Sequence, residues 1–265
     1  MALFVDTIFM AILNKVNMPI SFKEDHISQI PALLMLEKLG YTYLTPDEAL
    51  ALRGGNPANV LLESVLRKQL AAINVVQVSS TRTTVFSEQN ITAGIEALRN
   101  IPMDEGFMEA SQTVYDLLTF GKTLEQIVDG DRKSFVMQYI DWKDIRNNVF
   151  HVTEEFAVSC TGMTDTYRPD IVLFVNGIPL CVIECKRPDV KDSIEQAISQ
   201  HLRNQKADGI RSLYLYSVLL LAINRQEGSY ATTATPEKFW ARWREQFTDR
   251  EEEARYRQEL ERVVN

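Results

Sequence analysis

Two carboxylates and one lysine lie close together in the segment RPDIVLFVNGIPLCVIECKRP, which covers residues 168–188. Asp170 opens its first apolar run, and Glu184 and Lys186 stand two residues apart at the end of its second run. Residues two apart on a strand project from the same face of the sheet. Carboxylate oxygens at the end of a sheet suit a hard cation such as Mg²⁺ or Mn²⁺. Such an ion polarises a phosphate and lowers the pKa of a bound water, and Lys186 would position or deprotonate that water or neutralise developing charge.

The strand that carries Glu184 and Lys186 is apolar on both faces until its last residues, so neither side chain belongs to a solvated surface. Burying an unpaired charge costs several kcal/mol, so these groups need counter-charges or a metal. The alternative is an interstrand salt-bridge cluster at the sheet end, because a Glu-x-Lys pair on a strand is common.

A shared site requires a particular hairpin register. Asn176-Gly177 is a strong hairpin signal, but a plain two-residue turn would place Asp170 opposite Ile183 and facing away from Glu184. A three-residue loop over 175–177, with Gly177 left-handed, shifts the register by one, so that Asp170 pairs with Val182 and shares the face of Glu184. We predict that loop, or a bulge of equal effect.

The surrounding sequence indicates an α/β fold in which a mixed central sheet is flanked by helices and the N-terminal part is largely helical. We expect the domain that carries this site to cover 1–230, with a helical part at about 1–130 and a core of hairpin, helix and strand at about 131–230. A charged helical tail is expected over 231–265. The expected helices cover 24–39, 57–73, 90–99, 109–119, 123–128 and 192–206, and the expected strands cover 75–78, 135–140, 149–158, 170–175, 178–186 and 212–223.

Several sets of residues resemble a known family. Pro169-Asp170 followed by Glu184-Cys185-Lys186 resembles the PD-(D/E)xK nuclease superfamily. NNVFHVTEEF, AISQHLRNQ, LLLAIN and EKFWARWRE, together with the segment over 168–188, are similar to the N-terminal endonuclease domain of the R (motor) subunit of type I restriction enzymes. The strong part of the resemblance covers about 145–245.

The resemblance implies roles for individual residues. Asp170, Glu184 and Lys186 would be catalytic, and Asp170, Glu184 and the backbone carbonyl of Cys185 would bind the metal. Gln200 takes the glutamine position of a QxxxY motif on the next helix, whereas Asn204 stands where the tyrosine would be. The family's first helix can add a polar residue, for which Glu24 and His26 are candidates. The residues that we expect to contact DNA phosphates are Arg187, Lys191 and Arg203.

The resemblance also implies a longer protein. A superfamily 2 helicase motor would follow the nuclease, so ATP use and translocation would belong to chain outside this sequence, and the partners would be double-stranded DNA and the modification and specificity subunits. The whole chain of 265 residues has a formal net charge of −8, whereas the window from Lys186 to Arg211 has a net charge of +2. Because phosphate contacts require Lys and Arg, we expect a cutting domain that partners bring to DNA.

Composition sets further expectations. The cysteines are three, Cys160, Cys181 and Cys185, which argues against a disulfide framework and fits a reducing, cytoplasmic location without membrane association. We expect His151 and His201 to be surface or capping groups, Glu154 and Glu155 to be solvated, and the aromatic residues at 214, 216, 240 and 243 to serve packing. Two other function classes stay open: a stand-alone nuclease in repair or phage defence, and a catalytically idle nuclease fold used for docking.

Overall fold

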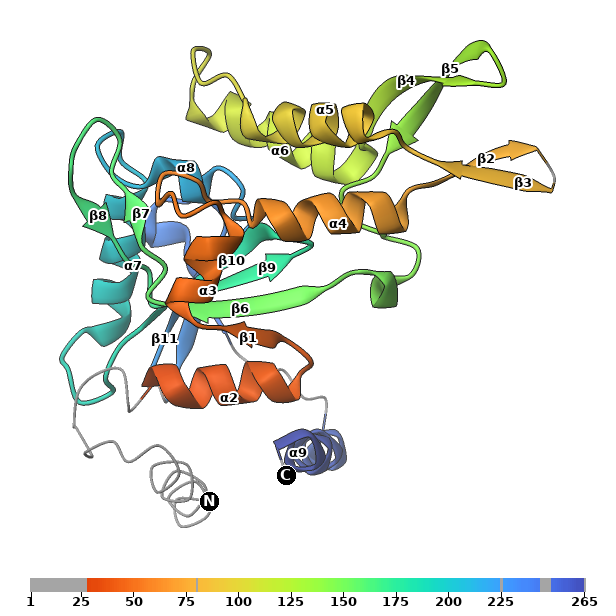
Figure 1. The fold of residues 1–265 in the computed structure, drawn as a ribbon. Helices are drawn as coiled ribbons and strands as arrows, with labels where there is room; N and C mark the ends of the chain where they lie inside the picture. The colour runs from red at the N-terminus through yellow and green to blue at the C-terminus, as the bar shows by residue number, and fades with distance from the viewer. Residues whose placement is uncertain (1–27, 80, 225, 244–248, 265) are drawn as a thin grey trace.

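The computed structural model describes residues 28–79, 81–224, 226–243 and 249–264. Its centre is a seven-stranded sheet in the order β1-β6-β9-β10-β11-β12-β13 (Figure 1). β1 pairs with β6 and β10 with β11 in parallel, and the other neighbours are antiparallel. This mixed sheet with flanking helices confirms the expected fold class. The strands are β1 (Thr42–Leu44), β6 (Phe150–Glu154), β9 (Ile171–Val175), β10 (Ile178–Cys185), β11 (Leu219–Ile223), β12 (Gly228–Ala231) and β13 (Ala241–Arg242).

A mainly helical unit covers one face of the sheet. In Figure 1, α4 lies on the sheet, α5 and α6 lie above α4, and two hairpins extend away from them. The helices of this unit are α3 (Pro46–Leu52), α4 (Glu63–Ile73), α5 (Glu88–Arg99) and α6 (Phe107–Phe120), and the hairpin strands are β2 (Val75–Ser79), β3 (Arg82–Val85), β4 (Lys122–Val128) and β5 (Asp131–Met137).

The expected helix over 123–128 is wrong, because this segment is strand β4. Its side chains alternate between inward and outward positions, which is the period of a strand rather than of a helix. β4 pairs with β5 along its whole length, from Lys122 opposite Met137 to Val128 opposite Asp131. The other expected helices of this region overlap α4, α5 and α6, and the strand expected at 75–78 is β2.

The two faces of the central sheet are both covered. Val172, Phe174 and Val182 belong to the large core that includes α4, α5 and α6. The opposite face packs against α2 (Ile30–Lys38), whose buried residue is Leu33. Each fully buried aliphatic side chain contributes about 1.5–3 kcal/mol, so this double cover fixes the position of β9 and β10. Pro31 stands in the first turn of α2, where a missing N–H costs little, and so begins the helix.

The segment between β10 and β11 is a helical crossover made of α7 (Ser193–Asn204) and α8 (Arg211–Tyr214). The expected strand over 212–223 is therefore only half right: its first part is helix α8, which buries Leu213 and Tyr214, and its second part is β11. A continuous apolar run does not distinguish a buried helix from a buried strand. A small hairpin of β7 (Val158–Ser159) and β8 (Thr166–Tyr167) completes this end of the molecule.

Beyond β11, the chain continues the sheet before it becomes the expected charged helix. β12, a 3₁₀ turn at Glu237–Phe239 and β13 precede α9 (Arg250–Val264), which is rich in Glu and Arg. Among the residues that the structure describes, no helix is long and apolar enough to cross a membrane. The three cysteines are free thiols and are buried.

Candidate active site

The hairpin that joins β9 to β10 has a two-residue turn and a bulge. Val175 pairs with Ile178 across Asn176 and Gly177, whose φ angles are 52° and 84°. Of the two predicted alternatives, the three-residue loop is therefore wrong and the bulge of equal effect is confirmed. The register shifts between Pro179 and Cys181 instead, and proline in a sheet is found at edges and bulges because it lacks an N–H. Pro179 is the feature of the sequence that could have predicted this bulge.

The bulge brings Asp170 to the same face of the hairpin as Glu184, which is what a shared site requires. After it, Val182 pairs with Val172 and Ile183 with Ile171. One further step of this register places Asp170 directly opposite Glu184, rather than opposite Val182 as the three-residue loop would have done. Both carboxylates consequently lie on one face of the hairpin.

The turn itself is held in the core. The Asn176 side chain is fully buried, accepts a hydrogen bond from the backbone N–H of Val149 at 2.9 Å and donates one to the carbonyl of Tyr139 at 2.9 Å. Gly177 has so little room that an added Cβ would lie 2.6 Å from the carbonyl oxygen of Leu62. The register of the two strands is thus fixed from the helical unit.

Asp170 and Lys186 contact each other at the carboxyl end of β10. The backbone N–H of Cys185 donates a hydrogen bond to Asp170 Oδ2 at 2.6 Å, and Lys186 Nζ lies 3.6 Å from the same oxygen. Lys186 Nζ also donates to the carbonyl of Cys185 at 2.9 Å. The side chains of Asp170 and Lys186 are 17% and 12% exposed, so the pair lies at a partly open surface.

Glu184 is a buried carboxyl group with an incomplete set of partners. It is 0% exposed, and its Oε2 has no hydrogen-bond partner. Burial raises the pKa of Glu184 well above its ordinary value, the charge of Asp170 and a side-chain hydrogen bond with Asp170 raise it further, and Lys186 acts in the opposite direction. Two ionised carboxylates only accept hydrogen bonds, so their approach is stabilised by a shared proton or by a cation.

The residues present fit a small divalent cation. Among the described residues, no three His, Cys, Asp or Glu side chains are grouped to hold a metal ion. Mg²⁺, however, is usually bound through one or two carboxylates and keeps several waters. Asp170 and Glu184, together with the Cys185 carbonyl, offer that kind of donor set, and the close approach of the two carboxylates is the observation that fits a cation.

α7 forms a wall beside this pair. A groove of about 460 Å³ is lined by Lys186 and by residues of α7 that include Gln200 and Arg203. The buried Asn204 side chain donates a 3.5 Å hydrogen bond to Glu184 Oε1. The structure thus brings Gln200 and Arg203 to the same groove as Lys186, and it places Asn204 against Glu184.

The other expected DNA contacts lie away from this groove. Arg187 binds the carboxylate of Asp189, with its Nε 2.9 Å from Oδ1. The side chain of Lys191 is 91% exposed and lies 3.9 Å from Asp192. Glu24 and His26 lie outside the described residues.

The residues just before α2 reach the site and were not foreseen. Ser28 Oγ donates to the carbonyl of Lys186 at 2.8 Å, and the Gln29 amide donates to the carbonyl of Asp170 at 3.0 Å. Gln29 also donates to Glu154, which accepts a second bond from Tyr43 at 2.7 Å. The expectation that Glu154 is solvated is therefore wrong, because these two donors hold it at the end of β6.

Both histidine expectations also change. His201 is fully buried rather than a surface or capping group, and burial lowers the pKa of His201 to about 4. His151 is half-buried, and burial lowers its pKa. The expected packing role is confirmed for Tyr214 and Tyr216, which are buried in the core, whereas Trp243 is 61% exposed and contacts Tyr230 edge-on.

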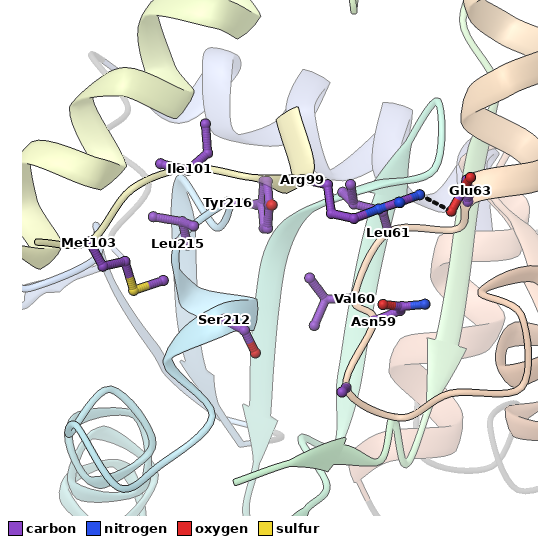
Figure 2. Close-up of a pocket in the computed structure, with 11 residues that line it drawn as sticks. Asn59, Val60, Leu61, Glu63, Arg99, Ile101, Met103, Ser212, Leu215 and Tyr216 are labelled. Carbon is purple, nitrogen blue, oxygen red and sulfur yellow. Dashed lines mark hydrogen bonds and ion pairs between the residues drawn. The ribbon is translucent and has the colours of Figure 1, made fainter. Parts of the chain in front are cut away.

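A second cavity, of about 110 Å³, lies between the helical unit and α8 (Figure 2). Its most polar feature is the ion pair between Arg99 and Glu63, drawn as a dashed line in Figure 2. None of the predicted site residues lines it, so this cavity is separate from the carboxylate pair.

Fold and site together define a class. A mixed sheet whose central hairpin ends in two facing carboxylates and a lysine is a restriction-endonuclease-like core. The chain belongs to the family formed by the N terminus of the type I restriction enzyme R protein, because the sequence model of that family matches residues 21–239.

Relatives agree with this assignment. The chain is 26% identical over 227 residues to the putative type I restriction enzyme MjaIXP endonuclease subunit of Methanocaldococcus jannaschii, covering 83% of this chain and 20% of that subunit. It is 28% identical over 206 residues to the type I restriction enzyme HindI endonuclease subunit of Haemophilus influenzae, covering 75% of this chain and 18% of that subunit. The chain therefore spans about a fifth of the length of these relatives.

Proposed function

We propose that this chain is the metal-dependent DNA-cleaving domain of a type I restriction endonuclease subunit. The observation that carries the proposal is the convergence of Asp170, Glu184 and Lys186 at one end of the β9–β10 hairpin. A purely structural salt-bridge cluster pairs opposite charges, whereas here the buried Glu184 carboxyl faces a second carboxylate, Asp170, which raises its pKa.

Asp170, Glu184 and the Cys185 carbonyl would hold Mg²⁺ or Mn²⁺. When bound, the ion supplies Lewis-acid polarisation of the phosphate and lowers the pKa of water. The N–H of Cys185 holds Asp170 Oδ2 in place for this role, and Ser28 and Gln29, just before α2, donate hydrogen bonds to the backbone of the site. The donors are therefore oriented before any ligand arrives.

Lys186 would stabilise the reacting phosphate. In hydrolysis, the oxygen of water forms a bond to phosphorus, one P–O ester bond breaks, and the proton lost by water is balanced by protonation of the leaving oxygen. Lys186 Nζ lies at the groove beside Asp170, where an ammonium group offsets the negative charge that grows on the phosphate. Gln200 and Arg203, on the groove wall, would contact the DNA backbone.

The acidic balance of the chain favours delivery to DNA by other parts of a complex. A net charge of −8 opposes unassisted phosphate binding. We therefore propose that the modification and specificity subunits, and an ATP-driven motor in the longer subunit, bring double-stranded DNA to this domain.

Cleavage of supercoiled plasmid tests the proposal. The chain, and separately the full-length subunit assembled with modification and specificity subunits and ATP, is assayed in Mg²⁺ and in EDTA. Nicking or linearisation is expected only with Mg²⁺, and is expected to disappear in Asp170→Asn and Glu184→Gln. Glu125→Gln, an exposed change on β4, is the matched control. Cleavage that survives EDTA or both site variants contradicts the proposal, and absence of cleavage in both settings favours a docking role.

A further inference from the structure

Asn204 places a buried amide against the Glu184 carboxylate. It stands at the end of α7, is 1% exposed, and donates from Nδ2 to Glu184 Oε1 at 3.5 Å. Buried polar groups are stable only when they are hydrogen-bonded. The buried Asn204 amide is therefore stable only through hydrogen bonds with the groups around it.

Arg203 fixes which way the amide faces. Asn204 Oδ1 accepts from Arg203 Nε at 3.4 Å and from Nη2 at 3.3 Å. The oxygen and nitrogen of an asparagine are assigned from such partners. The opposite orientation would turn an N–H toward the guanidinium and an oxygen toward the carboxylate, and both contacts would be repulsive. Only one orientation satisfies both neighbours.

A second hydrogen-bonded chain supports the amide from the other side. Burial, and next the charge of Glu184, raise the pKa of Tyr214, and a hydrogen bond from Asn204 acts in the opposite direction. The Tyr214 hydroxyl lies 3.0 Å from His201 Nδ1, and His201 Nε2 lies 2.9 Å from the carbonyl of Leu221. A carbonyl only accepts, so Nε2 carries the proton and Nδ1 accepts from Tyr214. The chain thus ends on the backbone of β11.

The backbone of Asn204 is held as firmly as its side chain. The N–H of Ile210 donates to the Asn204 carbonyl at 2.9 Å. The turn over this carbonyl is so close that a Cβ on Gly209 would lie 2.5 Å from its oxygen. The end of α7 therefore has little freedom to move relative to Glu184.

We propose that Asn204 is a positioning residue that orients Glu184 for divalent-cation binding, an inference that rests on the proposed function. Its N–H donates to Oε1, which leaves Oε2 and the facing Asp170 carboxylate for the cation. Removing such a partner of a metal ligand weakens metal binding by about 10-fold to 100-fold.

Mn²⁺ binding without DNA tests the role directly. The electron paramagnetic resonance signal of free Mn²⁺ is followed in titrations of the unmodified chain and of Asn204→Leu, which preserves shape but removes the donor. Asn204→Ala, which adds no bulk, is measured alongside in case the leucine variant does not fold. We expect a dissociation constant raised about 10-fold in both variants, measured below the thermal unfolding midpoint of each variant in EDTA.

Asn74→Ala is the matched control. Asn74 is also a buried asparagine, and its amide donates to the carbonyls of Leu70 and Gln138 in the helical unit. This variant is expected to unfold at lower temperature and to bind Mn²⁺ normally. Unchanged Mn²⁺ binding in the Asn204 variants, with binding lost in Glu184→Gln, overturns the positioning role alone. No Mn²⁺ binding by the unmodified chain overturns both the role and the proposed metal site.

Discussion

Glu184→Gln separates a metal site from a structural ion cluster through the sign of its effect on stability. The buried Glu184 carboxyl faces Asp170, and burial together with that charge raises its pKa, so the folded chain either keeps a proton on Glu184 or holds two negative charges side by side. Glutamine keeps the shape, still accepts from Asn204, and donates an N–H toward Asp170 without either cost. Relief of one unsatisfied buried group contributes about 1–3 kcal/mol, so the variant is expected to be more stable than the unmodified chain when no metal is present.

The assay is thermal unfolding in EDTA at pH 7.5. For a domain of this size, each kcal/mol moves the midpoint by about 2–4 °C, so the expected rise is roughly 2–12 °C. Mg²⁺ is expected to stabilise the unmodified chain and to leave the variant unchanged, because ligands stabilise the state that binds them. Glu154→Gln is the matched control: that carboxylate accepts from Gln29 and Tyr43, so its neutralisation is expected to lower the midpoint.

The pH dependence provides a second check. The pKa of Glu184 is raised in the folded state above its unfolded value of 4.5, so the folded state retains a proton that the unfolded state loses. The contribution of Glu184 to the stability of the unmodified chain consequently falls as pH rises above 4.5, and the advantage of Glu184→Gln over the unmodified chain is expected to disappear at pH 4.5 and below. A midpoint in EDTA that falls by the equivalent of about 3–5 kcal/mol, as when a buried ion pair is broken, would refute the reasoning.

Three further changes have defined outcomes. Lys186→Met is expected to lower Mg²⁺-dependent plasmid cleavage by at least about 100-fold while Mn²⁺ binding is kept, and retained cleavage would exclude the role given to Nζ. Gly177→Ala is expected to lower the free energy of unfolding in urea by at least about 1–2 kcal/mol, because of the left-handed backbone and the 2.6 Å approach of a Cβ to the Leu62 carbonyl oxygen. Gly130→Ala, at a residue with φ +85° and open space around it, is expected to lower it less, and equal losses of unfolding free energy would contradict this reasoning. The pKa of His201 is lowered to about 4 from 6.5, so the contribution of His201 to stability falls as pH drops from 6.5 toward 4, by up to about 1.4 kcal/mol per unit. The stability of the unmodified chain relative to His201→Gln is expected to fall over this range, and a constant difference would be inconsistent with burial as the cause of the lowered pKa.

The sequence was most informative where a turn dipeptide or a clear change of hydrophobic spacing is compatible with a single kind of element. Asn176-Gly177 predicted the hairpin, and the switch from strand to helical spacing after Pro188 predicted α7 and the crossover to β11. It was least informative where period and composition conflict. The prediction of a helix over 123–128 is wrong because this segment pairs with β5, and the prediction of one strand over 212–223 is wrong in its first part, which is α8.

By itself, the sequence determined the fold class and the three residue types that could bind a cation and act on a phosphate. Glu184 and Lys186 share a strand, so their spacing alone placed them together. Only the tertiary structure decided that Asp170 faces Glu184, because a bulge at Pro179 reverses the facing that the two-residue turn would give. It also decided the neighbours of that pair, Ser28, Gln29 and Asn204, since contacts between residues far apart in the chain depend on how helices pack on the sheet, which no local pattern encodes.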